Sequence, residues 1–260
     1  MTFSIPDLTA QLRTLGVDPG GVLLVHMSYR AVRPVEGGPE GVIDALLAAV
    51  GGAGTVVMPS WTDDDDAVFD PLVSRANSDL GVTPDLFWRR RGARRGNHPF
   101  AFAALGPKAA NITADPLPLP PHRFESAVGR VLELGGQILL LGVGHDANTT
   151  IHLAEAMSGV PYGVPKHITV LQDGESTRIE YLENDHCCQR FALADDWLRA
   201  RGLQRDGLVG NARARLVNSR DLVEVVAGQL RADRLVFLHP SGGGCAECDD
   251  AHASIGRSRP

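Results

Sequence analysis

The sequence lacks the long apolar run of a membrane helix. No apolar stretch approaches the roughly 20 residues that a helix needs to span a bilayer. The first residues, Met1 to Asp7, lack a basic segment followed by an apolar core, so they do not form a signal peptide. No internal repeat or long low-complexity linker is present. These absences predict a soluble, cytoplasmic protein that does not bind membranes.

Positive charge is also scarce, since 25 Lys and Arg stand against 31 Asp and Glu, a net charge of −6. Binding a duplex needs a concentrated basic face, so the balance argues against a nucleic-acid partner and suits a cationic ligand. Four consecutive aspartates occupy 63–66, and one arginine cluster consists of Arg89, Arg90, Arg91, Arg94 and Arg95. These two groups could bind a cationic substrate and an anionic cofactor, or both could be solvated loops.

Strand and helix signals alternate along the first 160 residues. Strands are predicted over 22–26, 55–58, 100–104 and 137–141, and helices over 8–15 and 41–50. This βαβα order is typical of an α/β fold with a mostly parallel central sheet flanked by helices. With 43% hydrophobic residues, the chain is ordinary for a globular protein, so we expect one domain over 1–256 and a flexible tail over 257–260.

The second half of the chain predicts a β-hairpin outside the main sheet. Two short strands, 169–172 and 177–181, flank Asp173-Gly174, which is a strong turn signal. Helices over 187–201 and 222–231 follow, and a last strand is predicted over 235–238.

The segment from Gly142 to Glu155 is the most informative part of the chain. Gly142, Gly144 and Asn148 predict a tight turn and a helix N-cap directly after a buried strand. In open α/β sheets, ligands bind at this carboxyl edge of the strands. The helix carries His152 to that edge, and an imidazole with an ordinary pKa near 6.5 suits proton abstraction. From this pattern alone, His152 could equally be a core or helix-surface histidine.

The four cysteines form the second strong signal. Cys187 and Cys188 are adjacent, Cys245 and Cys248 form a CxxC, and His186 adds a fifth soft ligand. Structural zinc takes four such ligands in a tetrahedral array. Disulfides are rare in cytosolic proteins, so we predict a structural zinc, with free buried thiols as the alternative. Adjacent cysteines rarely both bind one metal with ease, so His186 is a candidate to replace Cys187.

Several segments together resemble one enzyme family, the aminoglycoside 3-N-acetyltransferases. They run in order from about Leu12 to Gly256: VLLVHMSYRAVRP (22–34), GTVVMPSW (54–61), HPFAFAALGP (98–107), LLLGVGHDANTTIHLAE (139–155) and YLENDHCCQRFALAD (181–195). The segments DHCCQRF and FLHPSGGGCAECD are most similar to the type IV branch, known for apramycin and gentamicin resistance. The resemblance implies the antibiotic N-acetyltransferase fold and excludes the GCN5-related fold.

The resemblance implies transfer of an acetyl group from acetyl-CoA to the 3-amine of a 2-deoxystreptamine aminoglycoside of the apramycin, gentamicin and tobramycin class. Transfer is expected to be direct, with His152 as general base, and no cysteine is expected in position for an acyl-enzyme. Among the acidic residues, Glu183 is favoured as the carboxylate that orients His152, and Asp185 as a substrate or supporting contact. The remaining candidates are His122 for substrate contact or proton transfer, and Asp146 and Glu155 as alternatives to Glu183.

The resemblance also implies the binding residues. An acidic rim with an aromatic wall for the aminoglycoside would consist of Trp61, Asp63, Asp65 and Asp66. The acetyl-CoA contacts would be Ser28, Tyr29, Arg33 and His98, although Met27 stands where the family often has serine. Neither a P-loop nor a GxGxxG motif is present, which argues against ATP or a dinucleotide.

Other functions stay open at this point. The same fold could acetylate a different amine, and a zinc-dependent hydrolase could use His122, His152, His186 and the aspartates as metal ligands. A CxxC usually closes a structural metal site, which argues against the hydrolase. A non-catalytic drug-binding module is a third possibility, and the oligomeric state, monomer or homodimer, is not predicted.

Overall fold

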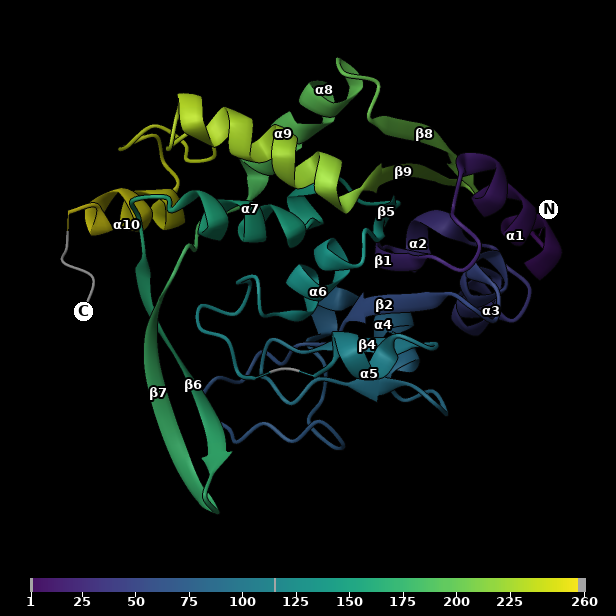
Figure 1. Cartoon of the computed structure of the whole chain (residues 1–260), viewed down its shortest axis with the longest axis horizontal. Helices are drawn as coiled ribbons and strands as arrows, with labels where there is room; N and C mark the ends of the chain where they lie inside the picture. Colours follow the sequence, from purple (N-terminus) through teal and green to yellow (C-terminus); the bar gives the residue numbers. More distant parts are fainter. Residues whose placement is uncertain (1, 115, 257–260) are drawn as a thin grey trace.

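A seven-stranded sheet forms the centre of the molecule (Figure 1). The computed structural model describes residues 2–114 and 116–256, so the predicted tail over 257–260 lies outside it. The strands, in spatial order, are β3 (Arg94–Arg95), β4 (Phe102–Leu105), β2 (Thr55–Pro59), β1 (Val22–Met27), β5 (Gln137–Leu141), β9 (Ala212–Asn218) and β8 (Gln204–Val209). The three central strands β2, β1 and β5 are parallel, and only β4 and β9 run the other way. The predicted mostly parallel sheet is therefore confirmed.

Helices cover both faces of this sheet. On one face lie α1 (Ile5–Leu15) and α3 (Gly38–Val50), which share a core with Leu23 and Val25 of β1. On the other face lie α6 (Ala127–Glu133), α7 (Thr150–Ser158) and α9 (Ser219–Ala232), whose core includes Leu24. Successive residues of β1 thus enter two different cores, which is why Val22–Val25 form a continuous apolar run.

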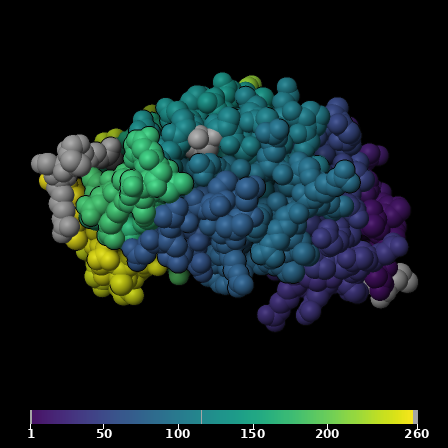
Figure 2. All heavy atoms as spheres, turned by 90° about the horizontal axis from the view of Figure 1, so that it is seen from below, coloured from purple at the N-terminus to yellow at the C-terminus, as the bar shows by residue number. Residues whose placement is uncertain are grey.

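The predicted hairpin is confirmed and projects from the sheet. It consists of β6 (Val164–Gln172) and β7 (Glu175–Glu183), and Asp173 and Gly174 both take a positive φ, as a tight hairpin turn requires. Figure 2 shows the hairpin in green against the blue loop that follows β2. There Thr169 Oγ1 donates a hydrogen bond of 2.7 Å to the carbonyl of Asp65. The hairpin therefore brings the predicted acidic rim next to the segment that follows β7.

Short elements complete the described part of the chain. The helices are α2 (Tyr29–Val32), α4 (Val82–Trp88), α5 (Ala109–Ile112), α8 (Leu193–Arg199) and α10 (Ala246–Ser254). The 3₁₀ turns are η1 (Ser78–Leu80), η2 (His145–Ala147) and η3 (Gln189–Ala192). Among these residues, no helix is long and apolar enough to cross a bilayer.

Two of the predicted elements differ from the structure, and β8 and β9 were not predicted. The strand predicted over 235–238 is wrong, because its backbone turns back on itself: the amide of Leu238 donates to the carbonyl of Leu235. The run is apolar because Phe237 is buried against Phe191. The helix predicted from Cys187 begins only at Gln189 with η3, so Cys187 and Cys188 precede it.

The central strand β5 should be the part of the sheet most sensitive to loss of apolar volume. Leu139 in β5 is 0% exposed, whereas Leu171 in β6 is 63% exposed. Leu139→Ala is expected to lower the free energy of unfolding in urea by about 2–5 kcal/mol, since it leaves a cavity in a closed core. Leu171→Ala is expected to change it by less than about 0.5 kcal/mol. Equal effects of the two substitutions would contradict this placement of the core.

Candidate active site

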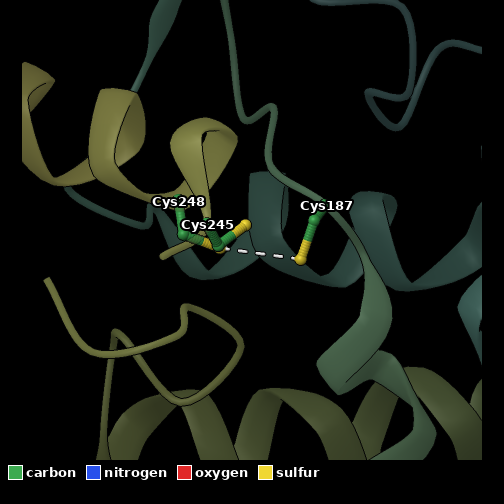
Figure 3. A group of neighbouring side chains, drawn as sticks. All are labelled: Cys187, Cys245 and Cys248. Carbon is green, nitrogen blue, oxygen red and sulfur yellow. Dashed lines mark hydrogen bonds between the residues drawn. The ribbon is translucent and has the colours of Figure 1, made fainter. Parts of the chain in front are cut away.

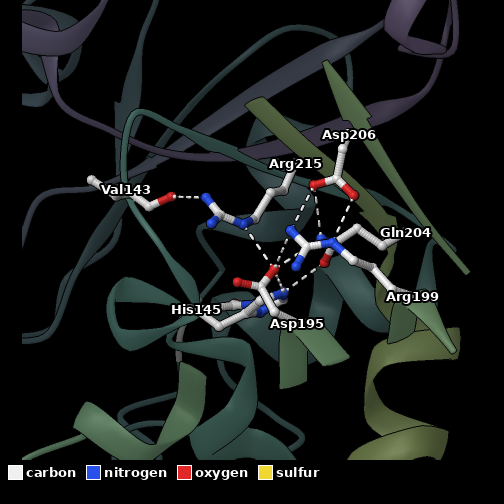
Figure 4. A network of polar contacts seen from close by, with 8 residues as sticks. Val143, His145, Asp195, Arg199, Gln204, Asp206 and Arg215 are labelled. Atoms are coloured by element: carbon white, nitrogen blue, oxygen red, sulfur yellow. Dashed lines mark hydrogen bonds and ion pairs between the residues drawn. The ribbon is translucent and has the colours of Figure 1, made fainter. Parts of the chain in front are cut away.

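The loop between β5 and α7 is held by buried polar contacts (Figure 4). It leaves β5 at Gly142, where φ is +74° and an added Cβ would lie 2.4 Å from Cβ of Ala31, so glycine is required. The fully buried His145 lies with Nε2 2.9 Å from Oε1 of Gln204 and with Nδ1 3.1 Å from Nδ2 of Asn148. Both ring nitrogens of His145 are therefore satisfied, which fixes the loop on β8.

An arginine on β9 ties the same loop to α8. Arg215 donates to Oδ1 of Asp195 at 2.8 Å and to the carbonyl of Val143 at 3.0 Å. Asp195 also accepts from Gln204, so one carboxylate joins β8, β9 and α8 behind the loop (Figure 4). This network sets the position from which α7 begins.

Helix α7 carries His152 to the carboxyl edge of the sheet. The N-cap of the helix is Thr149 and not the predicted Asn148, but Oδ1 of Asn148 accepts from the amide of Thr150 at 3.2 Å and so satisfies one donor at this end of the helix. Nδ1 of His152 lies 2.8 Å from Oε2 of Glu155, three residues further on the same helix face. Nε2 of His152 points away from the helix, toward Sγ of Cys188 at 3.3 Å.

Glu155 is a fully buried carboxylate with three hydrogen-bond donors. The donors are His152, His186 with Nε2 at 2.9 Å, and the hydroxyl of Tyr162. Burial by itself would raise the pKa of Glu155, but the hydrogen bonds from His152 and His186 lower it to about 2. The ionised Glu155 therefore keeps a proton on Nδ1 of His152 and leaves Nε2 free to accept one.

Glu155, and not the favoured Glu183, orients His152, so that prediction is corrected. Glu183 instead accepts a hydrogen bond of 3.2 Å from the hydroxyl of Tyr181, and burial together with Asp185 raises the pKa of Glu183 to about 7. The three-residue spacing from His152 to Glu155 on one helix is the signal that identifies the pair in the sequence.

The structure also brings a cysteine next to the base, and direct transfer without an acyl-enzyme stays a prediction. Cys188 Sγ lies 3.3 Å from Nε2 of His152 and 3.2 Å from the carbonyl of His186. Cys188 and His152 are 36 residues apart in the sequence, so no local pattern could predict this contact.

His152 opens onto a cleft of about 300 Å³. The predicted site residues that line it are Trp61, Asp65, His122, His152, Glu183 and Asp185. Two further lining residues are Asp146, a predicted alternative to Glu183 as the partner of His152, and Cys188, a predicted metal ligand. The lining residues that the sequence analysis did not assign to a site are Phe100, Ala147, Asn148, Thr149, Lys166 and Phe191. Asp185, which follows β7, pairs with Nζ of Lys166 in β6 at 2.6 Å. The cleft is thus rich in carboxylates, with an aromatic wall.

Three predicted residues lie elsewhere. Asp63 is exposed and is not among the residues that line the cleft. Asp66 binds His167 at 2.8 Å and Arg178 at 3.3 Å on the hairpin, so it fastens the loop after β2 to that hairpin. His98 is buried with Nε2 3.1 Å from the carbonyl of Pro118, and burial lowers the pKa of His98 to about 4.

His122 is the histidine nearest to His152 in the cleft wall. The two rings are stacked with centroids 5.5 Å apart. Burial lowers the pKa of His122 well below its ordinary value, and His152 beside it adds to this effect. A neutral His122 can pack against His152 and line the cleft without competing for the negative charge of Glu155.

The predicted donor segment lies at the same edge of the sheet. The amide of Ser28 donates to the carbonyl of Leu141 at 2.9 Å, so the end of β1 adjoins the end of β5. Tyr29 starts α2, and the carbonyl of Arg33 accepts from Asn211 at 2.8 Å. None of these three side chains is among those that line the 300 Å³ cleft, so their predicted contact with acetyl-CoA stays a prediction.

Three of the five predicted metal ligands come together. The thiols of Cys187, Cys245 and Cys248 lie within 4.8 Å of one another, with Sγ of Cys187 and Cys248 3.7 Å apart (Figure 3). His186 and Cys188 do not join them, because His186 faces Glu155 and Cys188 faces His152. The predicted ligand set is therefore corrected to three thiols. Cys187 precedes η3, and Cys245 and Cys248 lie at the start of α10.

A catalytic metal at the histidines is not favoured. The side chains of His152, Glu155 and His186 also lie within 4.8 Å of one another. Both imidazoles, however, donate to the carboxylate of Glu155, and Nδ1 of His186 accepts from the amide of Cys188 at 3.1 Å. These nitrogens are used in hydrogen bonds, which argues against the zinc-dependent hydrolase.

The chain matches one family of known proteins. The family model described as aminoglycoside 3-N-acetyltransferase matches residues 24–231. Aminoglycoside N(3)-acetyltransferase IV of Salmonella sp is 62% identical over 238 residues, which cover 92% of this chain and 91% of that protein.

Solved structures are similar over almost the whole chain, which confirms the predicted antibiotic N-acetyltransferase fold. A mutant of AAC(3)-IVa in which alanine replaces a histidine, in complex with a gentamicin, has a TM-score of 0.96 and 60% identity over 98% of both chains. The complex with apramycin has a TM-score of 0.90 and 57% identity, covering 95% of this chain and 98% of that one. The binary complex of AAC-IIIb with CoASH has a TM-score of 0.81 and 29% identity, covering 89% and 97%.

The contact between His152 and Glu155 should be visible in the titration of the imidazole. Burial lowers the pKa of His152, but Cys188 and Glu155 outweigh it and hold that pKa well above its ordinary value. Glu155→Gln removes a negative charge, so the imidazolium should lose its proton at a lower pH than in the wild type. The measurement is the histidine ¹³Cε1 shift by NMR across a pH series. Glu183→Gln is the matched control, and a larger downward shift from Glu183→Gln than from Glu155→Gln would refute the assignment.

Proposed function

Because the chain belongs to the aminoglycoside 3-N-acetyltransferase family, we propose that it acetylates the 3-amine of an aminoglycoside with acetyl-CoA and so confers antibiotic resistance. The observation that carries this proposal is the pair of His152 and Glu155 at the cleft. An imidazole that carries its proton on Nδ1 and can accept one at Nε2, and that is oriented by a buried carboxylate, is the base that an ammonium acceptor needs. The histidine replaced by alanine in the AAC(3)-IVa complexes is consistent with such a base.

The chemistry follows from the two nitrogens of His152. The acceptor amine attacks the acetyl carbonyl only after it loses a proton, and Nε2 is the atom that takes it. Nδ1 stays protonated against Glu155, so the negative carboxylate stabilises the imidazolium that forms. The pKa of His152 is raised in the ligand-free protein. Turnover should therefore increase with pH as His152 becomes neutral.

The cleft supports a polycationic acceptor. Carboxylates of Asp65, Asp146, Glu183 and Asp185 surround it, with Trp61 as an apolar wall. Burial raises the pKa of Asp65, and a bound ammonium group would favour the ionised form again. The complexes of AAC(3)-IVa with gentamicin and with apramycin support these two compounds as acceptors for this chain.

The donor is proposed from the same comparisons. The complex of AAC-IIIb with CoASH supports acetyl-CoA as cosubstrate. Ser28, Tyr29 and Arg33 remain the proposed contacts, because they follow β1 at the edge where β5 leads into the loop before α7. His98, buried against Pro118, would support the wall of the site without touching the donor.

A zinc ion at the three thiols is proposed as a structural site. Thiols of Cys187, Cys245 and Cys248 are suitable ligands at suitable spacing, and one further ligand would complete a tetrahedron. Such an ion would tie α10 to the segment after β7. A single domain over 1–256 and a cytoplasmic location, where free thiols persist, complete the proposal.

Loss of the base should abolish turnover. His152→Ala is expected to reduce the release of CoA thiol in the presence of gentamicin or apramycin by at least about 100-fold, the usual contribution of a general base. Glu224→Gln, an exposed change on α9, serves as the control for handling and folding. Turnover by His152→Ala at the control rate would rule out this base, and no turnover by the folded wild type with either compound would rule out these acceptors.

The metal can be counted directly. Protein purified without chelator is expected to hold about one zinc per chain by elemental mass spectrometry, as a site with thiolate ligands predicts. Cys248→Ser should lower both the zinc content and the melting temperature, because Cys248 is fully buried in the cluster. The same metal content in wild type and Cys248→Ser would mean that the thiols are simply packed.

A further inference from the structure

One cation stands among the carboxylates of the cleft. The lining residues include Asp65, Asp146, Glu183 and Asp185, and among the described residues that line the cleft Lys166 is the only lysine or arginine. We propose that Lys166 is a specificity-determining residue: in the ligand-free protein its ammonium group occupies the position at Asp185 that an ammonium group of the acceptor must take. This inference rests on the proposed function, because it requires a polycationic acceptor in this cleft.

The contact between Lys166 and Asp185 is close and charged. Nζ of Lys166 lies 2.6 Å from Oδ2 of Asp185, and the two side chains are 36% and 37% exposed. Burial lowers the pKa of Lys166, but Asp185, Glu183 and Asp65 outweigh it and raise that pKa, so the ammonium stays protonated. The charge of Asp185 is therefore compensated before any acceptor arrives, at a place that water and solutes can still reach.

The hairpin places this lysine where it can serve the cleft. The register of β6 and β7 sets Lys166 opposite Tyr181, four residues before Asp185, and a lysine carries its charge on a flexible four-carbon stem. Adjacent residues of a strand point to opposite faces, and His167 beside it binds Asp66 at 2.8 Å. His167 thus fastens the loop after β2 to the hairpin, which leaves Lys166 for the contact with Asp185.

The chemistry of lysine suits a group that is meant to be displaced. The sequence contains two lysines, Lys108 and Lys166, and its other basic side chains besides histidine are arginines. An arginine can grip a carboxylate with two parallel hydrogen bonds, whereas lysine offers a point charge with three rotatable donors. The primary ammonium of Lys166 is also the same chemical group that an aminoglycoside carries. An incoming ammonium group can therefore replace it at Asp185, one ion pair for another.

This exchange makes the cleft selective for acceptors with several ammonium groups. An acceptor that directs an ammonium group at Asp185 frees Lys166 to turn toward water. An acceptor without that group leaves Lys166 in the cleft, where it repels the remaining positive charge of the acceptor. Apparent affinity falls by the fraction of time that a site is competent, so a carboxylate that is free about a tenth of the time weakens binding about tenfold.

Removal of the lysine charge should improve the binding of the acceptor. Lys166→Met keeps the length of the side chain, and it is expected to lower the KM for gentamicin and for apramycin by about three- to tenfold, with kcat changed less than about twofold. The KM for acetyl-CoA should not change. Lys166→Arg keeps the charge and should show a KM at or above that of the wild type. Lys108→Met, at an exposed position before α5, is the matched control. A KM in Lys166→Met that equals or exceeds the wild-type KM would overturn the inference.

A double-mutant cycle locates the effect at Asp185. If Lys166→Met acts by freeing this carboxylate, its gain should vanish when Asp185 is already replaced, so Asp185→Asn and the double variant should have the same KM within about twofold. An equal gain in both backgrounds would mean that Lys166 acts by general repulsion and not at Asp185, and this result would also overturn the inference.

The displacement can be observed directly, because lysine labelled with ¹³C gives only two ¹³Cε signals from this chain. Gentamicin is added to the wild type without acetyl-CoA, so that no transfer occurs. At saturation the signal of Lys166 should move toward its position in Asp185→Asn, and the signal of Lys108 should not move. A Lys166 signal that stays in place while gentamicin is bound would reject the inference even if the protein acetylates gentamicin.

The same experiment separates the inference from the proposed function. Displacement of Lys166 by gentamicin in a protein that transfers no acetyl group would support the role of Lys166 and reject only the activity. A wild type that binds neither gentamicin nor apramycin would reject both. Since the signal is read on the wild type, misfolding of Lys166→Met does not affect this outcome.

Discussion

The carboxylate of Glu155 is the group on which the arrangement of the site depends. An ionised group that is fully buried must be compensated by hydrogen bonds or opposite charge, because solvation by water is lost. Glu155 meets this requirement with the side chains of His152, His186 and Tyr162, which come from α7, from the segment after β7 and from the turn between α7 and β6. One buried charge therefore joins three parts of the chain, and it fixes the tautomer of His152 at the same time.

Two supports bring these parts to Glu155. Behind the loop before α7, the network of His145, Asp195 and Arg215 sets where the helix begins (Figure 4). On the other side, the hairpin β6–β7 delivers Glu183 and Asp185 into the cleft and leads directly to His186. The loop after β2 is fastened to the hairpin through Asp66 and Thr169, so the acidic wall and the base belong to one assembly. The central sheet supplies the edge, and two of the four carboxylates that line the cleft, Glu183 and Asp185, come from the end of the hairpin and the segment after it.

Local patterns in the sequence were sufficient for much of this structure. Apolar runs located β1, β2 and β5, and Asp173-Gly174 located the hairpin turn, because both signals lie within a few residues. The strand, turn and helix around Gly142 located His152 at the correct edge. The partner of His152 could not be settled in this way, since Glu183 and Glu155 are both plausible until tertiary contacts are known. The run 235–238 was misread because apolar residues buried in a turn have the same composition as a strand.

The two adjacent cysteines show why the remaining part could not be predicted, and what their separation means. The direction of the Cys188 side chain depends on a left-handed φ. Residues other than glycine seldom adopt this conformation, so the sequence does not predict it here. With that backbone, Cys187 meets the thiols of α10 while Cys188 meets His152. Any contact that holds Cys187 on α10 also restrains the next residue, because the two share a peptide bond. The position of Sγ of Cys188 therefore depends on the thiol cluster of Cys187, Cys245 and Cys248. Although this cluster lies away from the cleft, it contributes to the placement of Cys188 beside His152.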